Sequence, residues 1–100
     1  MKKIEYFVTE HPDFRKDVKH LIKKKRFKSL PEQVIELEDA LERGKFPGTL
    51  IRRIEEPKPY ELYKLRLPNL DTKVGKSNGY RIIYIVVTEH RVVVILTIYI

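Results

Sequence analysis

Residues 60–99 read YELYKLRLPNLDTKVGKSNGYRIIYIVVTEHRVVVILTIY, and this stretch decides the fold. From Tyr60 onward the hydrophobic period is two, which is typical of a strand with one buried face. Residues 63, 65 and 67 then share one face, while Lys64 and Arg66 point to the other. A polar loop at 68–79 ends this strand. Residues 80–87 and 91–99 are apolar on both faces, which predicts two central strands joined as a hairpin.

Two helices and a first strand are predicted upstream of this region. Residues 3–9 are β-branched and aromatic enough for a short strand. Apolar residues at 14, 18, 21 and 22 then have helical spacing on a basic segment that Pro12 opens. The run Ser29-Leu30-Pro31-Glu32 has the pattern of a capping box for a second, acidic helix, which we expect to end at Gly44.

The predicted element order is β-α-α-β-β-β, an α+β fold. A helical hairpin with charge-complementary flanks would pack on one face of a mainly antiparallel sheet. Residues 45–59 contain three prolines and are predicted to be a loop with a short extended piece at 50–54. The other face of the sheet would be partly open, with Lys64 and Arg66 on it.

Composition limits the functional classes. One hundred residues correspond to a single compact domain, and the absence of cysteine excludes a disulfide framework or a thiol nucleophile. The 21 Lys and Arg against 14 Asp and Glu give a net charge of +7, which suits a polyanionic partner or, equally, a basic surface that only aids solubility. The N-terminus has no signal-peptide pattern, and charged residues interrupt the apolar stretch 80–100, so we expect a cytoplasmic protein without a membrane span.

The densest group of candidate functional residues lies at 63–81. Lys64 and Arg66 alternate on one strand, Lys73 and Lys76 lie in the glycine-containing loop, and Arg81 opens the next strand. Hairpin geometry can bring Lys64, Arg66 and Arg81 onto one face of the sheet. Such a cation cluster suits a phosphodiester site, because negative charge builds on the non-bridging oxygens in the transition state.

At this point the sequence resembles a known family. The segments YKLR at 63–66, GKSNGYRIIY at 75–84 and LTIY at 96–99 are similar to the RelE/ParE superfamily of bacterial toxin–antitoxin toxins, and most similar to its RelE/HigB-like branch. The Gly-Lys-Ser-x-Gly-Tyr-Arg core is the specific part of the match. The predicted element order extends the resemblance over residues 1–100 as one toxin domain. Members commonly continue beyond the last strand into a Ser- and Lys-rich segment and a short helix that can contribute a catalytic or ribosome-contacting residue, and the given sequence departs from this pattern by stopping at Ile100, directly after Tyr99.

The resemblance implies an endoribonuclease that cleaves mRNA on the ribosome and that a cognate antitoxin protein inactivates. It implies attack by the RNA 2′-OH on the adjacent phosphate, with no metal and no cofactor. The catalytic candidates it implies are Lys64, Arg66, Arg81 and Tyr99; the RNA-binding candidates are Lys73 and Lys76. The arginines would stabilise the charged phosphorane, and Lys64 or Tyr99 would assist proton transfer.

Other interpretations of the same residues stay open. Lys64 and Arg66 also fit ordinary outward charges on a half-exposed strand, and Tyr99 also fits a packing residue at the chain end. Residues 23–26 are interpreted as a solvated helix end in preference to an RNA contact, because cations are favourable at a helix C-terminus. For the whole chain, the alternatives are a ParE-like or degenerate member that acts by protein contact, and a basic RNA-binding domain with an incomplete catalytic set.

Overall fold

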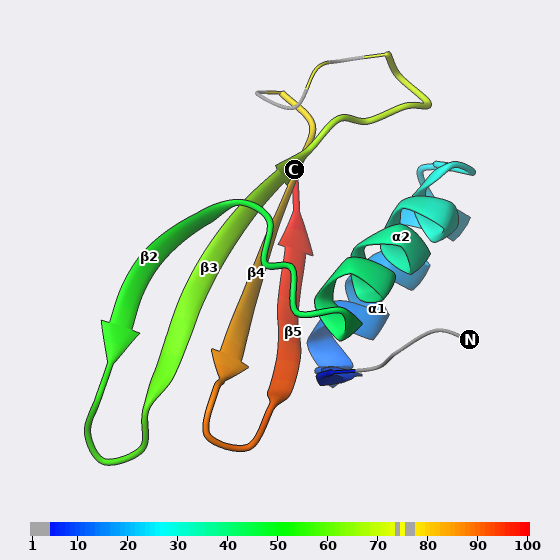
Figure 1. Ribbon diagram of the computed structural model, residues 1–100. Coiled ribbons are helices and arrows are strands. Elements are labelled where there is room, and N and C mark those ends of the chain that lie inside the picture. The colour runs from blue at the N-terminus through cyan, green and yellow to red at the C-terminus, as the bar shows by residue number, and fades with distance from the viewer. Residues whose placement is uncertain (1–4, 74, 76–77) are drawn as a thin grey trace.

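The computed structural model describes residues 5–73, 75 and 78–100. Its helices and strands follow one another in the order strand, two helices, four strands (Figure 1). They are β1 (Phe7–Glu10), α1 (Pro12–Lys23), α2 (Leu30–Glu42), β2 (Thr49–Ile54), β3 (Tyr60–Leu67), β4 (Tyr80–Val87) and β5 (Val92–Tyr99).

The five strands form one sheet in the order β1-β5-β4-β3-β2. β1 pairs with β5 in parallel, and the other three pairings are antiparallel, so the predicted α+β fold with a mainly antiparallel sheet is confirmed. The short extended piece expected at 50–54 is a full edge strand paired with β3. Of the first strand expected at residues 3–9, residues 3 and 4 lie outside the described residues. β1 begins at Phe7, because the amides of Glu5 and Tyr6 both donate to the Glu42 carbonyl at the end of α2 (2.7 and 3.0 Å).

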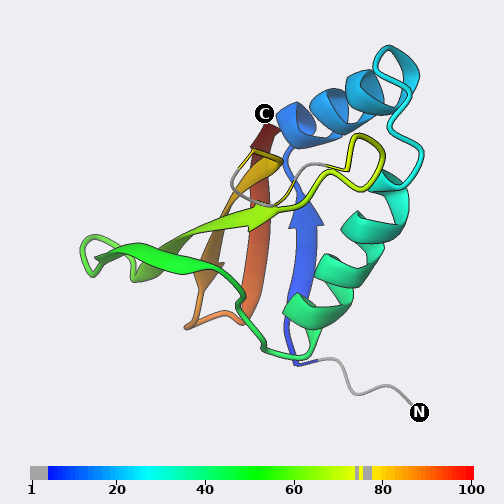
Figure 2. The ribbon, with the colours of Figure 1, turned by 90° about the horizontal axis from the view of Figure 1, so that it is seen from above.

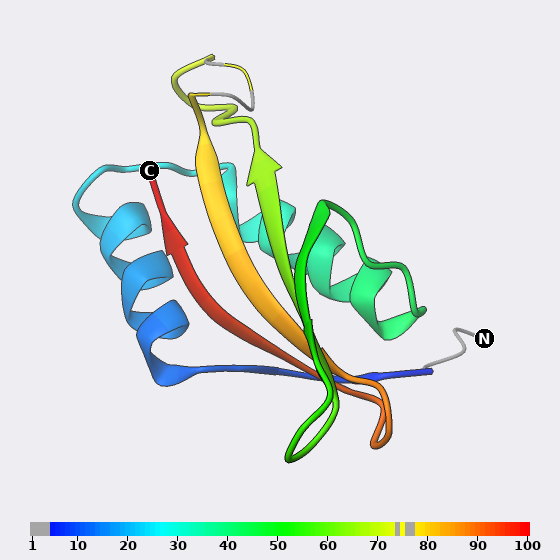
Figure 3. The same ribbon diagram turned by 90° about the vertical axis from the view of Figure 1, so that its left-hand side faces the viewer.

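Both helices lie on the same side of the sheet and diverge from their connection (Figures 2 and 3). The core lies between them and the alternate residues of the central strands. Fully buried members include Phe14, Leu30, Leu41, Tyr80, Ile82, Tyr84, Val86, Val93 and Ile95. Along β4, residues 80, 82, 84 and 86 are buried while 81, 83, 85 and 87 are half-buried, so one face of the strand packs on the helices and the other is open.

The predicted capping box at the start of α2 is wrong. Ser29 has helical dihedral angles, and its side chain makes no capping bond. Its backbone amide and its hydroxyl instead donate to the carboxylate of Asp71, at 3.0–3.2 Å. The Asp71 carboxylate thus accepts from the Ser29 amide, for which Glu32 would be the acceptor in a capping box, and it also accepts from the hydroxyl, which joins Ser29 to the loop after β3.

The other helix termini follow local sequence rules. Pro12 occupies the first turn of α1 as predicted, and the side chain of His11 accepts a hydrogen bond from the Asp13 amide as its N-terminal cap. Gly44 follows α2 with a φ of +79°, which confirms it as the helix end. Among the described residues, no helix is long and apolar enough to cross a membrane.

Candidate functional site

Arg66, Arg81 and Tyr99 form a row across three neighbouring strands on the open face. In the sheet register Arg66 lies directly opposite Arg81, and Arg81 lies directly opposite Tyr99. Side chains in such positions have their Cβ atoms about 5 Å apart, so all three can touch one small ligand. The flanking residues Leu65 and Ile82 enter the core, which turns this row away from the helices.

Lys64 belongs to the next row of the same face. Its register partners are Thr49 on β2 and Ile83 on β4, and Ile83 is in turn opposite Thr97. None of these register partners is itself acidic, and the carboxylate that reaches this row is that of Asp17 on α1, which accepts a hydrogen bond from the Thr97 hydroxyl at 3.4 Å.

A hollow of about 630 Å³ opens beside the two cations of β3. Its lining includes Gly48, Thr49 and Ile51 from the start of β2 together with Lys64 and Arg66. Gly48 allows the segment that leads into β2 to pass close to β3, because its φ is +101° and a Cβ there would overlap the backbone carbonyl of Lys64. The hollow therefore offers room for a ligand that the cations bind.

The structure brings together four of the six predicted site residues. Lys64, Arg66, Arg81 and Tyr99 share the open face at the end where β3 finishes and β4 begins. Lys73 lies on the loop that joins these two strands, exposed and with a φ of +60°. Lys76 lies outside the described residues. The sequence interpretation missed the contribution of β2, whose only signal was the short extended piece at 50–54.

Polar side chains fasten the base of the β3–β4 loop to the helices. Gln33 of α2 is buried and donates to the Pro68 carbonyl at 2.8 Å. The buried Asn69 side chain accepts hydrogen bonds from the amides of Asp71 and Thr72. With the bonds between Ser29 and Asp71, they fix the first part of the loop, directly after the end of β3 that carries Arg66.

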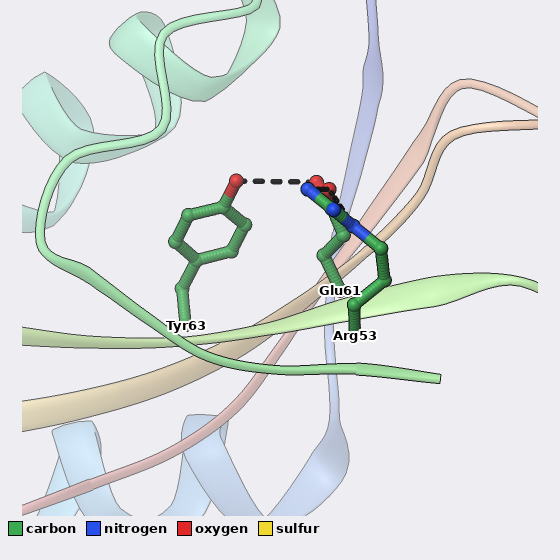
Figure 4. A network of polar contacts seen from close by, with 3 residues as sticks. All are labelled: Arg53, Glu61 and Tyr63. Atoms are coloured by element: carbon green, nitrogen blue, oxygen red, sulfur yellow. Dashed lines mark hydrogen bonds and ion pairs between the residues drawn. The ribbon is translucent and has the colours of Figure 1, made fainter. Parts of the chain in front are cut away.

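The opposite face of β3 carries a different polar network (Figure 4). The guanidinium of Arg53 donates to Glu61 at 2.9 and 3.1 Å, and the Tyr63 hydroxyl donates to the same carboxylate at 3.1 Å. Burial, followed by this hydrogen bond and the Glu61 charge, raises the pKa of Tyr63. The Tyr63 ring stacks on Tyr84 with centroids 5.1 Å apart, so this network is structural and separate from the cationic rows.

The chemistry available on the open face is anion binding and charge stabilisation. The planar guanidinium of arginine donates two parallel hydrogen bonds to a phosphate, and two arginines lie opposite each other in the sheet register here. The described residues contain no group of three or more His, Cys, Asp or Glu side chains that could hold a metal ion. The arrangement therefore suits a phosphate-containing ligand recognised by cations.

Comparison with known proteins places the chain in a family. Residues 8–99 match the model of the ParE toxin of type II toxin–antitoxin systems, parDE. Because the match spans nearly the whole sequence, the chain belongs to this toxin family, and the predicted membership of the RelE/ParE superfamily is confirmed. The model is that of ParE, so the predicted RelE/HigB branch stays a prediction.

Solved structures and curated proteins add little to this assignment. The chain is similar to the archaeal RelE–RelB complex from Pyrococcus horikoshii OT3 at 21% identity, over 95% of this chain and 93% of that one, with a TM-score of 0.46. No curated protein matches the chain.

Proposed function

We propose that this toxin is a metal-independent endoribonuclease that cleaves mRNA on the open face of its sheet. The observation that carries the proposal is the row in which Arg66 and Arg81 lie opposite each other beside Tyr99, with Lys64 in the next row. Two guanidinium groups at this spacing can bind both non-bridging oxygens of one phosphodiester.

In the proposed reaction the RNA 2′-OH attacks the adjacent phosphorus. The new bond joins the 2′ oxygen to phosphorus, the bond to the 5′ oxygen breaks, and the products are a 2′,3′-cyclic phosphate and a 5′-OH. Arg66 and Arg81 stabilise the extra negative charge of the phosphorane. The 2′-OH loses a proton and the 5′ oxygen gains one, and Lys64 and Tyr99 are the groups of the site that assist these transfers.

The proposal includes the cellular setting that the family resemblance implies. The toxin acts in the cytoplasm, where mRNA is translated, and cleaves on the ribosome. A cognate antitoxin protein holds it inactive, as the toxin–antitoxin family description suggests. Residues 1–100 act as one toxin domain.

Expression of the chain in bacteria with mapping of mRNA 5′ ends tests the proposal. We expect new ends in translated messages from the native chain and a loss of about 10²–10³ in cleavage rate for Arg81→Ala, the usual effect of removing one transition-state donor. Lys58→Ala is the matched control, because it removes one exposed cation from the β2–β3 turn, at the opposite end of β3 from Arg66. Cleavage that persists in the Arg81 variant contradicts the mechanism.

The family match favours a second candidate function. A ParE-like toxin would act by contacting a protein target without cutting RNA, and the matching model is that of ParE. Growth arrest by the native chain without new mRNA ends, in cells and with purified ribosomes, would support this alternative and reject the nuclease.

A further inference from the structure

The molecule is electrically polarised along its strands. The α1–α2 connection, the β3–β4 loop and the C-terminus lie at one end, and the β2–β3 and β4–β5 turns lie at the other (Figures 1 and 3). The first end includes the basic corner, which we define as residues 23–28 with the sequence Lys-Lys-Lys-Arg-Phe-Lys. The far turns carry Glu55, Glu56 and Glu89 together with Lys58 and Arg91, so their net formal charge is −1.

The cations of the basic corner are exposed to solvent, and Phe27 holds this segment against the core. All five of its cations are exposed, while Phe27 packs against the core. The Phe27 ring meets the ring of Tyr80 edge-on, with centroids 5.9 Å apart. Tyr80 immediately precedes Arg81, so the corner is held at the strand end that carries the site.

The β3–β4 loop joins the corner to the site. The Asp71 carboxylate accepts hydrogen bonds from the Ser29 amide and hydroxyl, one residue beyond the corner. These hydrogen bonds occupy the Asp71 carboxylate, whereas Lys73, two residues further along the loop, is exposed. Cations therefore follow one another from the open face, over the loop, to the helix side.

We propose that the basic corner is a second contact surface for the RNA backbone, continuous with the open-face site across the β3–β4 loop. This inference rests on the proposed function and extends it: the substrate is a strand long enough to pass around the end of the sheet. It replaces the sequence interpretation of residues 23–26 as a solvated helix end, because the contacts of Phe27 and Ser29 hold these cations beside the strand end that carries the site. RNA fits this surface better than an acidic protein does, because the corner exposes no large apolar side chain of the kind that protein interfaces bury at their centres.

RNA binding measured by fluorescence anisotropy over a range of salt concentrations tests the inference. The probe is a ~12-nucleotide RNA with 2′-O-methyl groups, which lacks the nucleophile and stays intact, beside a ~4-nucleotide version that spans the site alone. The test variant is Lys23→Gln, Lys24→Gln and Lys25→Gln together. The control is Lys45→Gln, Lys58→Gln and Arg91→Gln together, which removes the same charge elsewhere.

Each neutralised phosphate on a single strand contributes about 0.7 to the slope of log affinity against log salt. Losing three contacts should lower the slope by about 2 and weaken binding of the longer RNA by up to about 100-fold at ~0.1 M salt. The control variant and the short RNA should change little. Thermal unfolding of both variants verifies that each is folded.

Several results would overturn the inference: equal losses in both triple variants, an unchanged salt slope, no RNA binding by the native chain, or corner-dependent binding of a polyglutamate peptide in place of RNA. Its failure is distinguishable from failure of the nuclease proposal. A chain that cuts RNA while the corner variant binds normally rejects only the corner, and corner-dependent binding without cleavage rejects only the nuclease.

Discussion

Glu38 lies where α2 meets β1 and α1, and its pKa depends on how closely these elements pack around it. Its side chain hydrogen-bonds Glu10 at the end of β1, and Glu42 follows one turn later on α2. The Arg15 guanidinium of α1 lies 3.4 Å from the Glu10 carboxylate. Burial, the hydrogen bond with Glu10 and the charges of Glu10 and Glu42 raise the pKa of Glu38 from 4.5 to about 7, against the opposing charge of Arg15.

The change Glu38→Gln should therefore stabilise the protein in a pH-dependent way. A carboxyl whose folded pKa is raised contributes stability below its unfolded pKa, and that contribution is lost as the pH rises through the folded value of about 7. The full shift corresponds to roughly 3 kcal/mol at 1.36 kcal/mol per unit. Because the group is partly solvated, screening reduces our expectation to about 1 kcal/mol.

The assay is thermal unfolding of the native chain and the variant from about pH 4.5 to about pH 8. The melting temperatures should agree at the acidic limit, and the variant should melt about 4–8 °C higher at the alkaline limit. Glu36→Gln, an exposed position on the same helix, is the control for a general charge effect. A difference that does not vary with pH, or an equal gain in the control, would refute the raised pKa of Glu38.

Three further changes test the loop, the hollow and the arginine pair. Asp71→Asn should cost about 1–2 kcal/mol in urea unfolding, because the neutral amide is a weaker acceptor for the α1–α2 connection; an unchanged midpoint would contradict this. Gly48→Ala should cost more than about 2 kcal/mol through its left-handed φ and overlap with β3, whereas Gly75→Ala, with no neighbour within 4 Å, should be tolerated. Arg66→Gln should raise the free energy of unfolding by about 0.2–1 kcal/mol, because like charges opposite each other destabilise a sheet, and it should also weaken RNA binding. A lower free energy of unfolding in this variant would show that Arg81 does not repel Arg66.

The periodicity of the sequence was sufficient to predict the strands of the site but not their alignment. Alternation at 60–67 placed Lys64 and Arg66 on one face, and the structure confirms it. The loop at 68–79 is too long for its length alone to fix the register of the next strand. Gly79 helps to fix it in the structure, because a Cβ there would overlap the Leu67 carbonyl.

Features that depend on distant partners were outside the reach of local patterns. The capping box at Ser29 failed because its competitor, Asp71, is 42 residues away in sequence. The edge strand β2 was predicted only as a short extended piece, since its irregular register between Leu50 and Arg52 breaks the alternation that marks strands. Thr49 and Ile51 were therefore missing from the predicted site.

The placement of Arg66 opposite Arg81 sets two like charges side by side, and this connects stability with function. Two cations opposite each other repel, yet the other face of the same strands carries the buried Leu65, Tyr80 and Ile82, which hold the register in place. A phosphate bound between the guanidinium groups would convert that repulsion into two favourable contacts. A non-cleavable RNA should consequently raise the melting temperature of the native chain more than that of Arg66→Gln, because binding to the folded state alone adds stability in proportion to the logarithm of affinity. Equal increases would mean that the row does not receive the phosphate, even if RNA binds elsewhere on the protein.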